Sequence, residues 1–273
     1  MKQWQQWIVA ATVAALFAGS VAAQAPATKG AQYEPHVGQE GKDVVWVPMP
    51  DEQVNKLLDM AKVTPNDVVM DLGSGDGRTV IAAAKRGARA IGVEFNGDLV
   101  EFSKREAQKA GVGERTTFEQ GDLFKTDLHR ASVISLFLLQ EINLKLRPQL
   151  LNLTPGTRII TNTFHMGDWK PDSSEYFPPG CYSWCNLYLW IIPAKVDGYW
   201  KTPQGEIAMK QQFQTVSGTL GTGPAAVAIN GKLEGERIRF TAGGSHYSGL
   251  VKDKVIEGTV ETGNGIRPWR ATR

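Results

Sequence analysis

Over the first two thirds of the chain, short hydrophobic runs alternate with segments that carry apolar residues at helical spacing. We expect strands at 68–72, 89–94, 116–120, 133–139 and 158–164, with a last strand at 187–192. Helices are expected from near Asp51, a candidate N-cap, from 78 to 85, from about 98 to 110, and after 139 in a stretch that Pro148 breaks. Repeated strand–helix units of this kind predict a parallel sheet that helices cover on both faces.

After Pro193 the helical spacing disappears and short alternating segments replace it. Residues 237–240 alternate in the manner of a strand, and Asn230-Gly231 is the dipeptide typical of a tight hairpin turn. Residues 194–273 are therefore predicted to form a small antiparallel β domain, either a sheet or a partial barrel, with Trp200 and Trp269 in its core. A carbohydrate-binding or partner-binding surface is the alternative interpretation.

The first 23 residues have the composition of a secretory signal peptide. Lys2 is the only charged residue among them, residues 7–18 form an apolar core, and small residues precede Gln24. We expect cleavage there and a periplasmic or secreted mature chain without a transmembrane span. The alternative is a membrane anchor formed by the uncleaved segment. Residues 24–43 are mostly small and polar, which predicts a flexible leader.

Composition narrows the possible functions. Lys plus Arg total 30 and Asp plus Glu total 28, so the basic footprint of a nucleic-acid-binding protein is absent. Cys181 and Cys185 are too far apart to bond within one extended strand, but a turn between them permits a disulfide, so a disulfide and two free thiols both stay open. No metal site is expected, because no His or second Cys pair lies near them in sequence.

A glycine-rich turn follows the first predicted strand. Asp71 lies near the strand end, Gly73, Gly75 and Gly77 follow at alternate positions, and a helix begins at Arg78. Glycines allow a sharp turn and a close approach of the backbone to a ligand. A strand, glycine turn and helix N-terminus in this order predict a nucleotide site. The dinucleotide fingerprint G-x-G-x-x-G does not fit, because Arg78 replaces its last glycine.

Two further acids come at the ends of the next two strands. Glu94 ends the second predicted strand, where an acid can accept hydrogen bonds from ribose hydroxyls, and Asp122 follows the third strand with Leu123 beside it. Each acid alone has an ordinary alternative, a solvated strand end for Glu94 and a helix or turn cap for Asp122. The carboxyl ends of parallel strands share one edge of the sheet, so we expect Asp71, Glu94 and Asp122 along that edge together with Glu141 and His165.

From residue 44 to about 193 the chain resembles the class I S-adenosylmethionine-dependent methyltransferases. Within that class it resembles small bacterial and mitochondrial-type protein-lysine methyltransferases, through Val-Pro before the first helix, the Asp71–Arg78 run, the Asp122-Leu123 pair and Asp168-Trp169-Lys170-Pro171. The resemblance implies a Rossmann-like sheet and S-adenosylmethionine as cofactor. It also implies that the cofactor-binding residues are Asp71, Gly73, Ser74, Gly75, Gly77, Glu94, Asp122 and Leu123.

The chain departs from methyltransferases that carry Asn/Asp-Pro-Pro-Tyr after strand four, because Gln140-Glu141 stands there. This difference argues against nucleobase or glutamine amino groups and leaves lysine, small amines or hydroxyls as acceptors. A lysine must lose its proton before it attacks, so we take Glu141 and His165 as candidate bases. The alternatives are a helix cap for Glu141 and a hydrogen-bonded strand-end histidine for His165. Trp169 is the candidate aromatic contact for an ammonium group, with a core position as its alternative.

The prediction is an exported S-adenosylmethionine-dependent methyltransferase whose acceptor is an amine, a protein lysine above all. Its partner is then a protein or small-molecule methyl acceptor and not nucleic acid; the oligomeric state stays open. One alternative is a catalytically silent methyltransferase fold that serves as a binding module in the cell envelope, since S-adenosylmethionine is made in the cytoplasm. Another is a small-molecule O- or N-methyltransferase.

Overall fold

The computed structural model describes residues 33–177, 181 and 183–273. The predicted signal peptide, residues 1–23, and the leader up to residue 32 lie outside this range, so cleavage and localisation stay predictions. Within the described part of the chain, no helix is both long and apolar enough to cross a bilayer.

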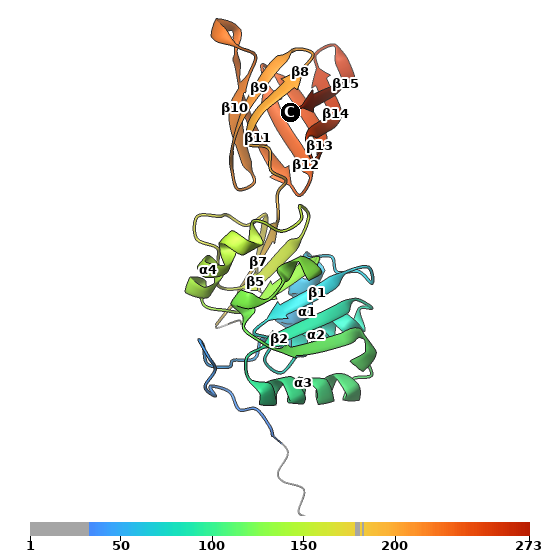
Figure 1. The fold of residues 1–273 in the computed structure, drawn as a ribbon, viewed down its shortest axis with the longest axis vertical. Coiled ribbons are helices and arrows are strands. Elements are labelled where there is room, and N and C mark those ends of the chain that lie inside the picture. The colour runs from blue at the N-terminus through green and yellow to red at the C-terminus, as the bar shows by residue number, and fades with distance from the viewer. Residues whose placement is uncertain (1–32, 178–180, 182) are drawn as a thin grey trace, which may run out of the picture. The chain divides into compact units, whose positions relative to one another are not determined.

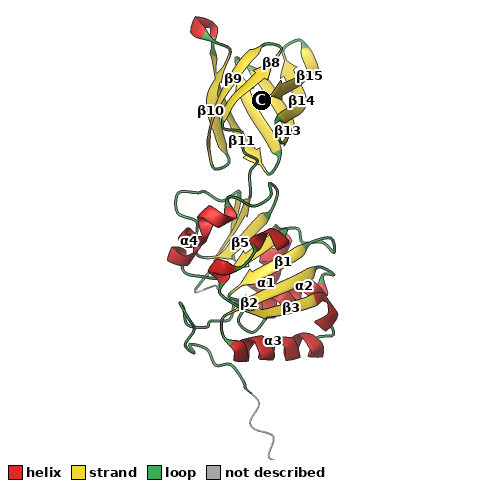
Figure 2. Ribbon diagram, viewed as in Figure 1, coloured by secondary structure: helices red, strands yellow, loops and turns green. Residues whose placement is uncertain are grey.

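The part of the chain before residue 193 folds around a seven-stranded sheet (Figures 1 and 2). The strand order in this sheet is β3-β2-β1-β4-β5-β7-β6. Its strands are β1 (Val68–Leu72), β2 (Arg89–Glu94), β3 (Thr116–Gln120), β4 (Val133–Leu136), β5 (Arg158–Asn162), β6 (Ser173–Tyr176) and β7 (Asn186–Ile191). The helices between them are α1 (Asp51–Met60), α2 (Arg78–Lys85), α3 (Gly97–Lys109) and α4 (Gln140–Leu150), with short 3-10 turns η1 (Gly113–Arg115), η2 (Leu123–Lys125) and η3 (Leu128–Arg130). The first five strands are parallel, whereas β7 runs antiparallel to β5 and to β6.

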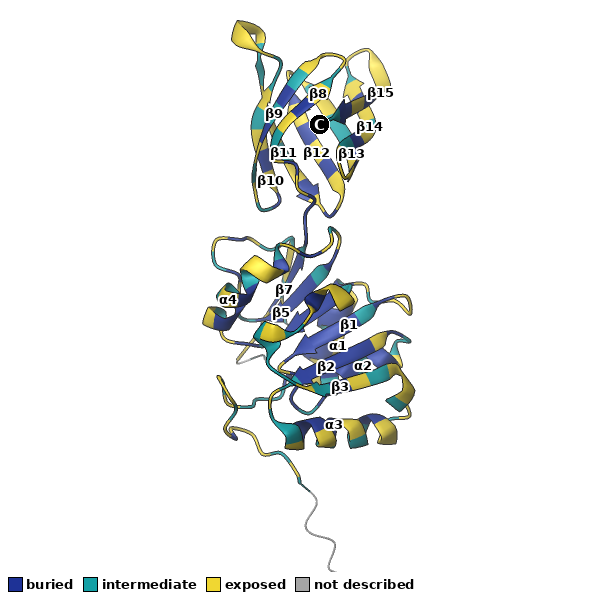
Figure 3. Cartoon of the chain, viewed as in Figure 1, coloured by how far each residue is buried: buried dark blue, intermediate teal, exposed yellow. Residues whose placement is uncertain are grey.

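Helices cover both faces because neighbouring residues of a strand point to opposite sides. Val69 of β1 packs in one hydrophobic cluster with Leu57 of α1 and Val80 of α2. Met70, the next residue, packs in a second cluster with Ile142 of α4. The central strands are buried on both sides, as Figure 3 shows, which explains their continuous apolar character. The predicted fold class is confirmed.

Several local predictions are wrong in instructive ways. Pro148 lies inside α4 and does not break it, because the helix continues to Leu150. Asp51 is the first helical residue of α1, and Pro50 occupies the N-cap position. The strand β6 was not predicted, because it is a short, mostly exposed polar segment at the edge of the sheet.

Strands four and five end earlier than their hydrophobic runs. The run at 133–139 is a strand only to Leu136, and the run at 158–164 is a strand only to Asn162. Phe137, Leu138 and Leu139 therefore lie beyond the strand end, and so does Phe164. These apolar side chains are available to line a cavity at the carboxyl edge of the sheet.

The amino ends of three parallel strands are joined by one buried carboxylate. Asp67 accepts hydrogen bonds from Ser132 Oγ at 2.7 Å and from Thr64 N–H at 2.8 Å, and it pairs with Arg158 at the start of β5. Burial by itself raises the pKa of Asp67, but these three partners outweigh it and hold the pKa below its ordinary value. This cluster fastens β1, β4 and β5 at the edge opposite the predicted cofactor residues.

The rest of the chain forms a closed eight-stranded antiparallel barrel, more complete than the predicted sheet or partial barrel. Its strands are β8 (Gly198–Thr202), β9 (Gly205–Gln212), β10 (Thr215–Leu220), β11 (Val227–Glu234), β12 (Arg237–Ala242), β13 (Ser245–Lys252), β14 (Val255–Thr262) and β15 (Gly265–Thr272), and the 3-10 turn η4 (Gly223–Ala225) precedes β11. Trp200 and Trp269 are buried in the barrel core, as predicted. The boundary near residue 193 lies between β7 and β8.

The prediction of a hairpin turn at Asn230-Gly231 is wrong. Both residues lie inside β11, where Gly231 pairs with Val216 on one side and Phe240 on the other. A β-carbon on Gly231 would come within 2.5 Å of Phe240 Cβ, so glycine is required here by close packing rather than by a turn. The dipeptide signal is therefore overridden by the packing of the barrel wall.

Candidate active site

A cavity of about 300 Å³ lies at the carboxyl edge of the sheet. Its volume is within the usual range for a small-molecule site. In sheet order its wall is built by Asp122 and Leu123 after β3, Glu94 and Phe95 at the end of β2, residues 73–76 after β1, Phe137 to Leu139 after β4, Phe164 after β5 and Trp184 before β7. The wall thus follows the strand order, with most acids over β1 to β3 and aromatic side chains over β4, β5 and β7.

The glycine turn closes tightly onto β2. The N–H groups of Gly73 and Ser74 both donate to the carbonyl of Val93, at 2.8 and 3.0 Å. Gly75 has a φ of 54°, and a β-carbon there would overlap the indole of Trp46. Only glycine tolerates both the left-handed backbone and this close approach.

Two residues of the predicted cofactor set, Gly77 and Ser74, contribute less to the cavity wall than predicted. Gly77 is the N-cap of α2 and is absent from the cavity wall; a β-carbon on it would lie 2.8 Å from Ser103 and from Phe118. Its role in the structure is close packing of α2 against α3 and β3. Ser74 contributes to the wall, but its hydroxyl is buried beside Gly92 and finds no hydrogen-bond partner among the described residues.

Glu94 organises the turn from the end of β2. Its carboxylate accepts the N–H of Gly75 at 2.9 Å and the N–H of Asn96 at 3.0 Å. These two bonds fix the carboxylate against the glycine turn on one side and the start of α3 on the other. Each carboxylate oxygen has further acceptor capacity, which is the chemistry that vicinal hydroxyls require.

Asp71 lies beneath the turn and is almost completely buried. Burial raises the pKa of Asp71 to about 7, and the hydroxyls of Ser135 and Thr79 only partly oppose this effect. The nearby carboxylates of Asp76 and Glu94 raise the pKa further. A buried acid on the wall of a cavity, with a pKa this far from its ordinary value, is typical of a functional site.

Asp122 lies on the cavity wall, as predicted for a ligand-binding residue, and it also caps a 3-10 turn, which was the alternative role. Its Oδ1 accepts the N–H of Phe124 at 3.0 Å and so caps η2, while its Oδ2 pairs with Lys42 Nζ at 3.0 Å. The Lys42 ammonium also lies 5.0 Å from the ring centroid of Phe95. Lys42, followed by the N–H of Phe124, lowers the pKa of Asp122. Leu123 completes this end of the wall.

An N-terminal strap, residues 40–49, forms another side of the cavity. The residues just before the strap are bonded to its middle: Gly38 N–H donates to the carbonyl of Trp46, and Trp46 N–H donates to the carbonyl of Gln39, both at 2.9 Å. Residues 46–48, just before α1, line the cavity and can cover a ligand. Residues 40–43 fall within the predicted leader but belong to the wall, and nothing in their composition points to a site.

The structure does not bring the two candidate bases to the cavity. Glu141 lies exposed in the first turn of α4, and His165 is exposed while its Nδ1 accepts the N–H of Gly167 at 3.0 Å. Neither residue is part of the wall. Trp169 is not part of the wall either. It is fully buried, and its ring stacks on that of Phe213 at a centroid distance of 5.8 Å. Trp169 is therefore a core residue, which was the alternative to a contact with the ammonium group.

The half of the wall over β4, β5 and β7 is aromatic and aliphatic. Phe137 meets the ring of Trp184 edge to face at 5.8 Å and lies 6.3 Å from the ring of Phe164. Leu138, Leu139 and Ile142 add aliphatic side chains to this part of the wall. Sequence reasoning missed this group because the two phenylalanines read as continuations of strands.

The acidic half fits S-adenosylmethionine. Asp71 and Glu94 place carboxyl groups beside a turn in which Gly73 and Gly75 carry no β-carbon, and Asp122 lies at the next strand end with the apolar side chain of Leu123. Such a wall can accept hydrogen bonds from an ammonium group, from ribose hydroxyls and from an amino group, and it offers an apolar surface to a purine ring. A diphosphate fits poorly, because the carboxylates of Glu94 and Asp122 would repel its charge.

Comparison with known proteins agrees with this geometry. Residues 71–173 match a family described as the ANTKMT methyltransferase domain. The chain is 38% identical over 163 residues to a protein-lysine N-methyltransferase of Saccharolobus islandicus, covering 59% of this chain and 96% of that protein. It is 35% identical over 121 residues to the adenine nucleotide translocase lysine N-methyltransferase of Mus musculus, covering 44% of this chain and 52% of that protein.

A solved structure is similar as well. The chain is 43% identical to an RNA methyltransferase of Salinibacter ruber in complex with S-adenosyl-L-homocysteine, with a TM-score of 0.52, over 55% of this chain and 96% of that one. S-adenosylmethionine is therefore the cofactor of this chain. The chain belongs to the class I S-adenosylmethionine-dependent methyltransferase family that includes the Saccharolobus islandicus protein-lysine N-methyltransferase.

Proposed function

We propose that this enzyme methylates the side-chain amine of a lysine in a protein. The observation that carries the proposal is the division of one cavity into an acidic half over β1 to β3 and an aromatic half over β4, β5 and β7. The first half suits the cofactor. The second half is then left for the acceptor, and its apolar and aromatic lining suits an aliphatic chain that ends in an amine.

The chain's own residues contribute mainly by positioning and by excluding water. When bound, S-adenosylmethionine supplies a methyl group attached to a positively charged sulfonium. Phe137, Phe164 and Trp184 surround the remaining space with apolar surface. The aromatic faces attract the amine in its cationic form, and the removal of water then lowers its pKa so that it can lose its proton. A neutral amine can then be held in line for attack, and alignment alone can supply a large part of the rate enhancement. Neither Glu141 nor His165 is required by this account.

The similar proteins support a protein acceptor. Two of those compared above carry lysine N-methyltransferase in their names, and the Asn/Asp-Pro-Pro-Tyr motif is missing after β4. RNA is the competing acceptor, because the Salinibacter ruber relative is described as an RNA methyltransferase. A net charge of +2 gives little support to RNA binding. A small-molecule amine or hydroxyl is the third possibility.

We further propose that the enzyme acts outside the cytoplasm after cleavage near Gln24. Support comes from the apolar core and small residues of the first 23 positions. Mass spectrometry of the protein from the envelope fraction decides this: a first residue of Gln24 is expected, and an intact Met1 contradicts cleavage. S-adenosylmethionine is made in the cytoplasm, so an exported enzyme needs a route by which the cofactor crosses the membrane. For this reason the alternative is a catalytically silent binding module in the envelope.

The test of the activity uses labelled methyl donor. The purified enzyme is incubated with S-adenosylmethionine carrying a labelled methyl group, together with envelope proteins or, separately, total RNA. Label in methylated lysine after acid hydrolysis is expected, and Glu94→Gln should reduce it. Label confined to RNA, esters or phenols contradicts the lysine proposal. No label with any acceptor, despite S-adenosylhomocysteine binding, favours the silent module.

A further inference from the structure

Among the aromatic side chains of this half, Phe137 and Phe164 follow the strand ends of β4 and β5, whereas Trp184 comes from the segment before β7. It precedes β7, lies about 38% exposed, and still meets the ring of Phe137 at 5.8 Å with an interplanar angle of 80°. Its φ is 54°, a left-handed conformation that is rare for a bulky side chain and persists only where its surroundings impose it. The backbone at Trp184 is therefore constrained by its local structure, and the residue lines the cavity.

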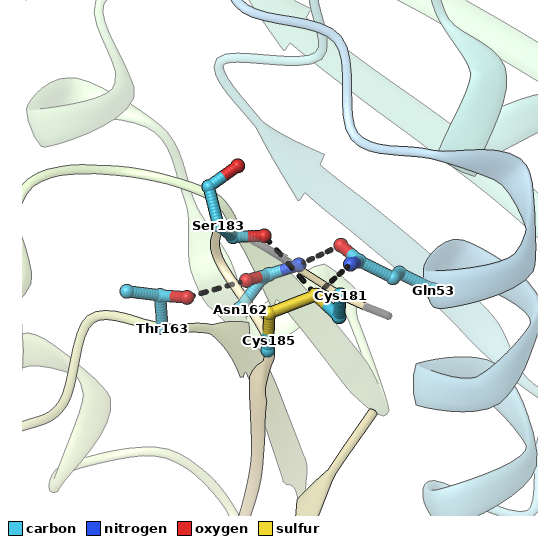
Figure 4. Close-up of a disulfide and its surroundings, with 6 residues drawn as sticks. All are labelled: Gln53, Asn162, Thr163, Cys181, Ser183 and Cys185. Carbon is cyan, nitrogen blue, oxygen red and sulfur yellow. Dashed lines mark hydrogen bonds between the residues drawn. A yellow bond between two sulfur atoms is a disulfide. The ribbon is translucent and has the colours of Figure 1, made fainter. Parts of the chain in front are cut away.

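A disulfide between Cys181 and Cys185 supplies that local structure. The sequence left a disulfide and two free thiols open, and the structure selects the disulfide, because the chain turns and brings the two Cα atoms to 5.9 Å. The covalent link closes a short loop that contains Trp184. Figure 4 shows the bond with its neighbours.

The disulfide is docked on a row of buried amides. Gln53 of α1 donates from Nε2 to Cys181 Sγ at 3.6 Å, and its Oε1 accepts from Asn162 Nδ2 at 2.5 Å (Figure 4). Asn162 in turn accepts from Thr163 Oγ1 at 2.8 Å. Gln53 and Asn162 are buried, so these bonds are shielded from water. The loop is thus tied to α1 and to the end of β5, beside Phe164.

The part of the cavity wall over β4, β5 and β7 carries no charged side chain among the described residues. The wall over β4, β5 and β7 consists of phenylalanine, leucine, isoleucine and tryptophan side chains, and the described residues add no ionisable group there. Aromatic faces carry negative electrostatic potential and attract an ammonium ion, most strongly for tryptophan. A neutral group of the same size gains only the apolar contact.

We propose that Trp184, positioned by the Cys181–Cys185 disulfide, is a specificity-determining residue that makes the acceptor half prefer a cationic alkylammonium over a neutral group of the same shape. The inference rests on the proposed function, because it assumes that the aromatic half of the cavity binds the acceptor and states which acceptor group that half prefers. Trp184 contacts the acceptor in this account, whereas Cys181 and Cys185 are positioning residues that act through it.

The experiment measures binding to the complex of the enzyme with S-adenosylhomocysteine. Two probes are titrated by calorimetry: Nα-acetyl-Nε-trimethyllysine amide, and its uncharged isostere in which a tert-butyl group replaces the trimethylammonium. The parent should bind the charged probe more tightly by roughly three- to thirtyfold, the range that a cation–aromatic contact supports. Trp184→Ala should abolish this preference and Trp184→Phe should retain part of it. The double variant C181S/C185S should lose most of it.

S-adenosylhomocysteine affinity and melting temperature provide the controls. Trp184→Ala should leave both near the parent values, and Tyr199→Ala, which removes an exposed aromatic side chain from β8, should change neither these nor the preference. Equal binding of the two probes by the parent overturns the proposal, as does an unchanged preference in Trp184→Ala. Label in lysine combined with equal probe binding would reject this inference alone. Label only in RNA would reject the proposed function whatever the probes do.

Discussion

At the residue scale, Asp71 shows how the site uses burial. Its carboxyl lies under the glycine turn with almost no contact with water, and this burial raises its pKa to about 7. Between about pH 4 and 7 the unfolded chain has lost the proton while the folded chain keeps it. Folding therefore takes up a proton over this range, and the free energy of unfolding falls as pH rises.

Replacing Asp71 by Asn should remove this pH dependence. Asp71→Asn should gain stability relative to the parent as pH rises from about 4 to about 7, with a constant difference above that range. Thermal unfolding of both proteins across pH 4 to 9 measures the difference. Glu114→Gln, which changes an exposed acid, serves as the control. A difference that does not vary with pH would show that Asp71 is not protonated in the folded enzyme.

At the scale of elements, the sheet has a structural edge and a functional edge. Asp67 joins the amino ends of β1, β4 and β5 through Ser132 and Arg158, while the cavity lies at the carboxyl ends of the same strands. The two clusters share no residue. Stability and cofactor binding should therefore respond separately to substitutions at the two edges.

Asp67→Ala is expected to lower the free energy of unfolding by about 2–3 kcal/mol, because it removes charge-assisted hydrogen bonds and leaves Arg158 without its partner. The folded pKa of Asp67 is lowered, so the stabilisation is present above the ordinary pKa of an aspartate and is lost as pH falls through the lower folded value. Urea unfolding at pH 7 and near pH 3 measures both effects. Weakened binding of S-adenosylhomocysteine would contradict the separation of the two edges.

Some elements of the fold and the site could be predicted from the sequence, and others could not. Buried strands, the glycine turn and the acids at three strand ends were predictable, since each follows from local pattern. The bases Glu141 and His165 were placed by strand-end position alone, and solvent exposure of both side chains could not be read from the pattern. Phe137 and Trp184 were missed because their roles depend on where a strand stops and on a disulfide that the sequence left open.

At the scale of the whole molecule, the barrel is not part of the cavity. All residues of the cavity wall lie between positions 40 and 184. The barrel nevertheless supports the core beside the sheet, because Phe213, in the turn between β9 and β10, stacks on the fully buried Trp169. Gln214 adds a bond from Nε2 to the carbonyl of Lys170 at 2.7 Å.

A chain that ends at Ala194 should therefore bind S-adenosylhomocysteine as the full chain does, but melt at a lower temperature. The loss arises because Trp169 becomes exposed where Phe213 covered it. Phe213→Ala in the full chain should reproduce part of the fall in melting temperature. Circular dichroism and calorimetry measure the two properties. Loss of the expected helices, or loss of binding in a folded product, would show that the barrel belongs to the same cooperative unit as the site.

The most direct test of the account is a calorimetric titration of the mature chain with S-adenosylhomocysteine. One site per chain is expected, and Glu94→Ala should weaken binding by roughly ten- to a hundredfold, because a charge-assisted hydrogen bond in a partly buried site is lost. Glu119→Ala is the matched control, since that acid on β3 pairs with Arg130 outside the cavity and should not affect affinity. Absence of binding to the parent, or equal binding by Glu94→Ala in a protein that melts normally, would contradict the assignment of this cavity to the cofactor.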